Sequence, residues 1–140
     1  MKAACPETHP HILLAEDDSD LRELLDFALT QAGFLVSCCD NGLQLLEMLE
    51  QNSTYDLVVS DLRMPALTGL EVLESQYDNR QRPPFICMTA FGDQQTHDMA
   101  RRFGVAATID KPFDLDEMIK LVQTTCRRQP NHDLPVRNCP

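Results

Sequence analysis

The sequence predicts an α/β fold in which five helices surround a five-stranded parallel sheet. Short apolar runs alternate along the chain with segments whose apolar residues recur every three to four positions. The apolar runs are nearly continuous, which is typical of strands buried on both faces of a parallel sheet. The chain has 140 residues, enough for one such domain with a full core.

The five predicted strands share a short apolar run with a polar or small residue near its end: 11–16, 34–38, 55–61, 84–90 and 105–110. Each is followed by a segment with helical spacing: 19–33, 41–52, 68–77, 93–104 and 114–128. Asp18 or Ser19 can cap the first helix. In the second helix, Leu43, Leu46 and Leu49 are predicted to face inward.

This alternation predicts right-handed crossovers between parallel strands, with helices on both faces of the sheet. A flavodoxin-like, doubly wound sheet of strand order 2-1-3-4-5 matches the chain in size. In that architecture ligands bind beyond the carboxyl ends of the strands, near the first and third.

We expect a tail over 1–9, the domain over 10–128, and a tail or linker stub over 129–140, a segment rich in proline. The chain has 12 Lys and Arg against 22 Asp and Glu, a formal charge of -10. This balance argues against direct binding of nucleic acid or of anionic membrane. No apolar run reaches the roughly 18 residues that a membrane span needs, so a cytoplasmic protein is expected.

Polar residues that carry chemistry follow four of the five predicted strands. Glu16 and Asp17 end the first strand, Asp61 ends the third, Thr89 lies near the end of the fourth, and Lys111 follows the fifth. Because the carboxyl ends of parallel strands meet at one edge of a sheet, these side chains are expected to share a pocket.

Carboxylates that converge on one pocket repel each other unless a hard cation lies among them. Mg²⁺ fits this set because it prefers oxygen ligands, commonly carboxylates, waters and phosphate oxygens. A metal, a Lys and a Thr hydroxyl beside carboxylates suit phosphoryl transfer, in which catalysis is mainly positioning and charge neutralisation. Asp61 is then the candidate nucleophile, since a carboxylate can carry an acyl phosphate.

The chain from His11 to about Arg128 resembles the receiver domain of two-component response regulators. The motifs LLAEDD, VVSDLRMPALTG, ICMTAFG and DKPF carry the resemblance, in the family's order and approximate spacing. DLRMP, TAFG and KPFDLDE look most like receivers of the nitrogen-regulatory lineage.

The resemblance implies a role for each matching position. Glu16 and Asp17 would hold Mg²⁺, with Asp61 and the backbone carbonyl of Arg63 as further ligands. Asp61 would accept a phosphoryl group from a histidine kinase or a phosphotransfer protein.

The other matching positions would respond to that group. Thr89 and Lys111 would bind the phosphoryl oxygens. Pro112 resembles the cis-proline of the family, although sequence gives the residue and not the isomer.

Two features depart from the family or vary within it. Receivers usually place an aromatic residue three positions before the motif's Lys, where this chain has Thr108. The route from the pocket to the output face is therefore in question. Arg63 and Phe91 occupy variable positions that tune the phosphoryl lifetime in the family. We expect this bulky pair to limit attacking water and lengthen that lifetime.

Each site residue also has an ordinary structural explanation. The acids at 16–18 could only cap a helix, Asp61 could be a turn residue before Pro65, Thr89 is a good strand residue, and Lys111 could be solvated surface. All four explanations would have to hold at one sheet edge, so a shared site is favoured. Asp18 is assigned to capping and Asp20 to surface charge.

Two competing functions share these residues. A dehalogenase-type phosphatase also uses an Asp nucleophile with Thr, Lys and Mg²⁺, but it needs a second acid where this chain has Arg63. A degenerate receiver used only for dimerisation would not need the intact site. We therefore expect a signalling switch that catalyses only its own phosphorylation and dephosphorylation.

The expected partners are the phosphodonor protein and a downstream protein target, and a homodimer is left open. The tail over 129–140 is too short for an output domain. The chain is then either a stand-alone receiver or the receiver fragment of a longer transcriptional regulator whose output domain is absent.

Overall fold

Five parallel strands and five helices alternate along the chain in the computed structural model, which describes residues 9–51, 54–64, 66–90 and 93–127. The strands are β1 (His11–Ala15), β2 (Leu35–Cys39), β3 (Leu57–Asp61), β4 (Phe85–Ala90) and β5 (Ala107–Lys111). The helices are α1 (Ser19–Gln31), α2 (Gly42–Gln51), α3 (Gly69–Ser75), α4 (Gln94–Arg102) and α5 (Leu115–Arg127).

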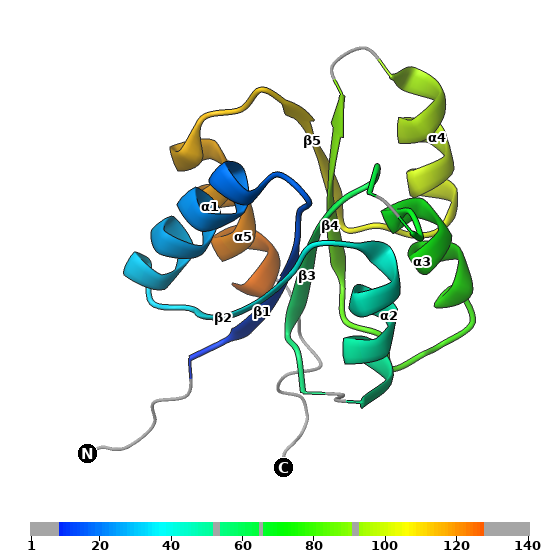
Figure 1. The fold of residues 1–140 in the computed structure, drawn as a ribbon, viewed down its shortest axis with the longest axis horizontal. Coiled ribbons are helices and arrows are strands. Elements are labelled where there is room, and N and C mark those ends of the chain that lie inside the picture. Colours follow the sequence, from blue (N-terminus) through cyan, green and yellow to red (C-terminus); the bar gives the residue numbers. More distant parts are fainter. Residues whose placement is uncertain (1–8, 52–53, 65, 91–92, 128–140) are drawn as a thin grey trace.

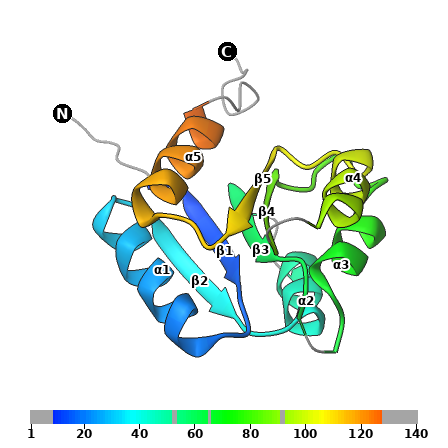
Figure 2. The same ribbon diagram turned by 90° about the horizontal axis from the view of Figure 1, so that it is seen from above.

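The strands form one sheet in the order β2-β1-β3-β4-β5, as the sequence predicts. Helices α1 and α5 cover one face, and α2, α3 and α4 cover the other (Figures 1 and 2). Alternate strand residues point to opposite faces, so β1 sends Ile12 and Leu14 toward α1 and α5, and Leu13 toward α2 and α3. The sheet is therefore buried on both sides.

The strand register brings the predicted site residues to one edge. Ala15 pairs with Ser60, so the residues that follow them, Glu16 and Asp61, are neighbours at the point where the strand order reverses. Thr89 pairs with Asp110 across β4 and β5. The carboxyl ends of β1, β3, β4 and β5 thus form the floor of one site.

The observed elements match the predicted ones to within a residue or two at each end. Asp18 caps α1, as the sequence indicates, by accepting hydrogen bonds from the amides of Asp20 and Leu21. The prediction for Leu43 is wrong, because its side chain is 50% exposed, whereas Leu45 is fully buried in its place. The predicted tails lie outside the described residues apart from His9, and no described helix is long and apolar enough to span a bilayer.

Candidate functional site

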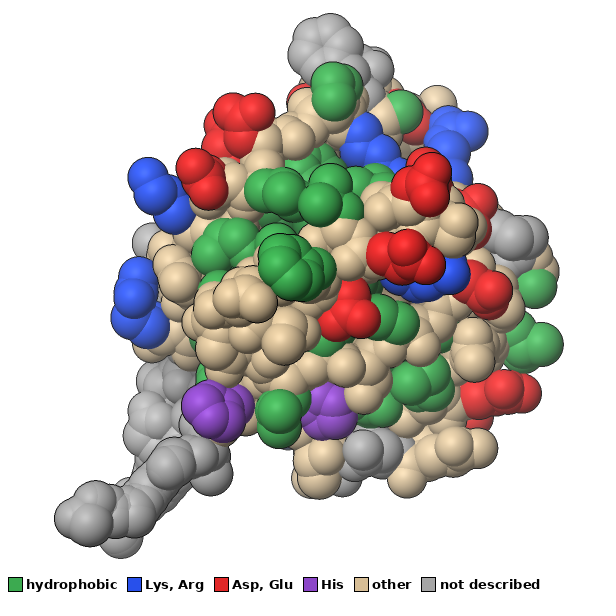
Figure 3. Space-filling view, turned by 60° about the vertical axis from the view of Figure 1, so that its left-hand side comes forward, with side chains coloured by type: hydrophobic (Ala, Val, Ile, Leu, Met, Phe, Trp, Pro, Cys, Tyr) green, Lys and Arg blue, Asp and Glu red, His purple; other side chains and the backbone are tan. Residues whose placement is uncertain are grey.

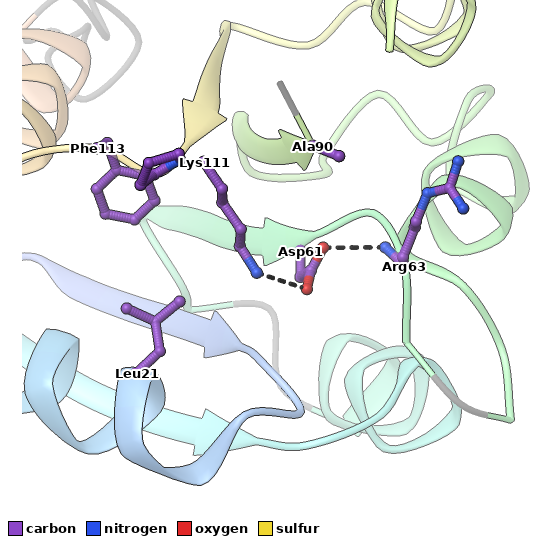
Figure 4. Close-up of a pocket in the computed structure, with 7 residues that line it drawn as sticks. Leu21, Asp61, Arg63, Ala90, Lys111 and Phe113 are labelled. Atoms are coloured by element: carbon purple, nitrogen blue, oxygen red, sulfur yellow. Dashed lines mark hydrogen bonds and ion pairs between the residues drawn. The ribbon is translucent and has the colours of Figure 1, made fainter. Parts of the chain in front are cut away.

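The carboxylate of Asp61 lies at the carboxyl end of β3, where two donors hold it. The Nζ of Lys111 donates to Oδ2 at 2.9 Å, and the backbone N–H of Arg63 donates to Oδ1 at 3.0 Å (Figure 4). Asp61 is only 7% exposed. Each oxygen is therefore oriented by a separate donor, one from β5 and one from the loop that follows β3.

Glu16 and Asp17 bring two further carboxylates to Asp61. One oxygen from each of the three groups lies within 4.8 Å of the others. Glu16 is fully buried and Asp17 is exposed, so the cluster reaches from the interior to solvent. Burial raises the pKa of Glu16, and the charge of Asp61 raises it further, while the hydrogen bond from Lys111 opposes both.

Lys111 is the cation of this cluster. Its ammonium lies 2.9 Å from Glu16 Oε1 and 2.9 Å from Asp61 Oδ2. Burial alone would lower the pKa of Lys111, but the hydrogen bonds to Asp61 and Glu16 outweigh it and the net pKa is raised. The peptide bond from Lys111 to Pro112 is cis, the isomer that sequence leaves undetermined.

Three carboxylates around one ammonium leave an excess of two negative charges. All the donor atoms are carboxylate oxygens, the type that a hard divalent cation prefers. Glu16 supplies one of them from a fully buried side chain, and an uncompensated charge there is costly. The residues present therefore fit a metal ion.

The loop after β3 holds the backbone of Asp61 in place. The hydroxyl of Ser60 donates to the Asp61 carbonyl at 2.9 Å. Thr68 caps α3 through a reciprocal capping box with Glu71. Gly69 then lies so close that an added Cβ would be 2.3 Å from the same Asp61 carbonyl oxygen. The first turn of α3 thus rests directly on the backbone of the candidate nucleophile.

A cavity of about 470 Å³ opens beside Asp61 (Figure 4). Its lining comes from α1, from the ends of β3, β4 and β5, and from the segments after β3 and β5: Leu21, Asp61, Arg63, Ala90, Lys111, Pro112 and Phe113. A small anionic group can therefore enter from solvent and meet both the carboxylate and the ammonium.

Thr89 lies at the neighbouring strand end, but its hydroxyl is directed to other partners. It donates to Asp110 Oδ1 at 3.0 Å and lies 2.8 Å from His97 Nε2. Thr108, the departure noted in the sequence, lies 3.0 Å from His97 Nδ1 through its own hydroxyl. Sequence reasoning missed His97 and Asp110.

Arg63 also has a partner that sequence reasoning missed. Its guanidinium is turned away from Asp61 (Figure 4) and binds Asp93, the residue that caps α4, at 2.8 Å. This pairing and two hydrogen bonds from Thr96 lower the pKa of Asp93 to about 2. Phe91, the other residue predicted to tune the lifetime, lies outside the described residues.

Comparisons with known proteins identify the family. The family model of the response regulator receiver domain matches residues 12–123. Regulatory protein AtoC of Escherichia coli K12 is 34% identical over 84% of this chain and 25% of its own length. The DNA-binding transcriptional regulator NtrC of the same strain is 36% identical over 80% of this chain and 24% of its own length.

A crystal structure of full-length FixJ from B. japonicum superposes with a TM-score of 0.80 and 31% identity, over 90% of this chain and 62% of that one. This chain therefore spans about a quarter of the length of AtoC and NtrC. The family is one of signalling proteins and not a classical enzyme family. From its sheet order, its acidic pocket and these matches, the chain belongs to the response regulator receiver domains of two-component systems.

Proposed function

We propose that this chain is the phosphoacceptor of a two-component or phosphorelay system, with Asp61 as the residue that carries the phosphoryl group. One observation supports this above the others. The Asp61 carboxylate is oriented by Lys111 and by the Arg63 amide at the wall of an open cavity, with Glu16 and Asp17 beside it.

In the proposed reaction, an Asp61 oxygen attacks the phosphorus of a phosphohistidine on a donor protein. The phosphorus–nitrogen bond breaks, its electron pair leaves with the histidine ring, and an aspartyl phosphate forms. Lys111 lies within hydrogen-bonding distance of Asp61 and offsets charge that builds up on the transferring group. The chain would thus catalyse only its own phosphorylation and, with water as nucleophile, its own dephosphorylation.

The metal in this proposal is Mg²⁺, held by Glu16, Asp17, Asp61 and the carbonyl of Arg63. When bound, it supplies positive charge to the phosphoryl oxygens. Lys111 already neutralises one of the three carboxylates, so a single divalent ion balances the cluster. Removing Mg²⁺ with a chelator should stop phosphorylation.

Three other side chains have proposed roles. Thr89 would turn its hydroxyl from Asp110 to a phosphoryl oxygen. Arg63 and Phe91 would limit the approach of water and so lengthen the phosphoryl lifetime. Arg63 lines the cavity with Asp61, which supports its part of this proposal.

The donor protein would approach over α1. Leu21 of α1 lines the cavity, and the same helix exposes Leu24 (47%) and Phe27 (64%). Apolar side chains gather on the side of the molecule that α1 and α5 form (Figure 3). A histidine-bearing partner that reaches Asp61 would cover this apolar surface.

The chain's signal would pass to a downstream protein or to an output domain carried by a longer regulator. AtoC and NtrC, which are about four times longer than the part that this chain matches, support the second form. A phosphorylation-dependent homodimer is a third form, which sedimentation would detect.

The proposal is tested by incubating the chain with acetyl phosphate and Mg²⁺ and measuring its intact mass. We expect the mass of one phosphoryl group to be added to the parent and none to be added to Asp61→Ala. Asp56→Ala is a matched control, since Asp56 is an acid at the opposite end of β3. An unmodified parent, or a phosphate that persists in Asp61→Ala, would refute the mechanism.

A further inference from the structure

The imidazole of His97 connects α4 to two strands at the site edge. Its Nε2 lies 2.8 Å from the Thr89 hydroxyl of β4 and 2.5 Å from Asp110 Oδ1 of β5. Its Nδ1 lies 3.0 Å from the Thr108 hydroxyl, also of β5. The side chain is 14% exposed. Both ring nitrogens are thus engaged in a nearly buried position.

The hydrogen atoms of this group follow from the charge of Asp110. Hydrogen bonds from His97 and then from Thr89 lower the pKa of Asp110, so its carboxylate is ionised and can only accept. The His97 Nε2 must therefore carry a hydrogen. Thr108 can donate to Nδ1 of a neutral ring or accept from a protonated one. The arrangement is consequently compatible with both charge states of the ring.

Thr108 occupies the position at which receivers usually carry an aromatic residue, and its hydroxyl meets the His97 ring. An imidazole from α4 therefore stands between Thr89 and Thr108. In this chain the group that contacts both threonines comes from α4 and is polar.

We propose that His97, together with Asp110, is the positioning group for Thr89 and transmits the phosphorylation state of Asp61 to α4. This inference rests on the proposed function. The Thr89 hydroxyl has one hydrogen, which it donates either to Asp110 or to a phosphoryl oxygen on Asp61. Phosphorylation therefore removes one of the two donors that Asp110 Oδ1 receives, and the link between β4, α4 and β5 changes with it.

Among the described residues, Asp110 is the only charged group that is hydrogen-bonded to the His97 ring. On α4 and its cap, Asp98 binds Gln94 and Arg101, and Asp93 binds Arg63. Three elements pack against α4, and their remaining titratable groups have other partners or surroundings. Lys111 of β5 is bonded to Glu16 and Asp61. On α3, Glu71 accepts from the Thr68 amide and Glu74 is exposed, and on β4 the burial of Cys87 raises its pKa to about 12.

The test compares His97→Leu and His97→Gln with the parent chain. Leu removes every polar contact, whereas the Gln amide can still donate to Asp110. His11→Gln is a matched control, because His11 also binds a hydroxyl, that of Ser37 at 2.7 Å, at the opposite end of the sheet. Melting temperatures establish that each variant folds.

Each chain is phosphorylated with acetyl phosphate and Mg²⁺, and hydrogen exchange of residues 94–102 is measured before and after. In the parent and in His11→Gln we expect phosphorylation to change this exchange by about fivefold, the equivalent of one net hydrogen bond. His97→Leu should still be phosphorylated but should lose the change. His97→Gln should recover part of it.

The comparison of the two variants separates positioning from a purely structural role. A ring that only packed against the strands would be replaced as well by Leu as by Gln, whereas a positioning group is replaced only by the side chain that can still donate to Asp110. A parental change of exchange in His97→Leu would overturn this inference alone. A parent that takes up no phosphate would instead refute the proposed function on which it rests.

Discussion

The contact between Gly69 and Asp61 makes the phosphorylation rate sensitive to a single methyl group. In Gly69→Ala the new Cβ would lie 2.3 Å from the Asp61 carbonyl oxygen and 2.8 Å from Ser60 Oγ. Ordinary contacts begin at 3.4 Å, so the first turn of α3 and the end of β3 must separate by about 1 Å. The nearest atom, the Asp61 carbonyl oxygen, belongs to the backbone, so no flexible side chain can absorb the movement there.

Two effects of different size follow from this displacement. Overpacking of this kind costs about 1–3 kcal/mol of stability. A shift of about 1 Å in a reacting group can cost up to about a hundredfold in rate. We therefore expect Gly69→Ala to be phosphorylated between about tenfold and a hundredfold more slowly than the parent, because the carboxylate moves relative to Lys111.

The assay is the rate of phosphate uptake from acetyl phosphate, measured by intact mass below the melting temperature of each variant. Gly33→Ala is the control for stability. Its Cβ would meet no atom within 4 Å, but its φ of +102° is strained for alanine, at a cost of about 1–2 kcal/mol. A Gly69→Ala variant that loses as much stability as Gly33→Ala and is phosphorylated at the parental rate would refute the reasoning.

Three further predictions concern Glu16, Asp93 and the pair Arg63 and Phe91. Burial raises the pKa of Glu16, so ionising this carboxyl destabilises the folded chain, and the loss of stability grows as pH rises from the ordinary pKa to the raised one. Without Mg²⁺, Glu16→Gln should therefore melt at a higher temperature than the parent at pH 7. The difference in melting temperature should narrow in acid, where Glu16 is protonated. A Glu16→Gln variant that melts below the parent at neutral pH would contradict this. The pKa of Asp93 is lowered to about 2, so its pairing with Arg63 stabilises the chain above pH 3.8, the ordinary pKa of the group, and this stabilisation is lost as pH falls through about 2. The melting temperatures of the parent and of Arg63→Ala should therefore converge near pH 2. A difference in melting temperature that stays constant with pH would argue against this pairing. Arg63→Ala and Phe91→Ala should each lose phosphate faster than the parent when loss is followed by mass, and unchanged rates would exclude the proposed shielding.

The sequence was sufficient for the sheet order because strands and helices alternate along a chain of the right size for this fold. It was sufficient for the acidic cluster because that cluster depends on strand ends. A buried strand has one carboxyl end, so Glu16, Asp61 and Lys111 could be brought together without coordinates. The inward face of α2 was harder, since its leucines at 43, 45, 46 and 49 fit more than one helical face. In the structure the buried face of the helix is the one that carries Gly42 and Leu45, and Gly42 lies so close to Leu67 that an added Cβ would collide with the Leu67 carbonyl.

His97 was missed for a different reason. A single histidine on a mostly polar helix gives no signal of a role. In the structure His97 precedes the fully buried Ala100 by three positions and so shares its face. The one sequence clue was the absence of an aromatic residue at position 108. That clue points to a changed contact near Thr89, but it does not name the helix or the residue that supplies it.

Helix α4 is the element that a change of charge at Asp61 should displace most readily. Ala100 is the one buried side chain among the described residues of the helix, so apolar burial contributes little to holding it. Polar contacts at two points connect it to the site instead: its cap Asp93 binds Arg63, whose amide donates to the nucleophile, and His97 binds Thr89. An element with little buried apolar surface moves at low free-energy cost. A change of charge at Asp61 should therefore displace α4 before α2 or α3, each of which buries more apolar side chains.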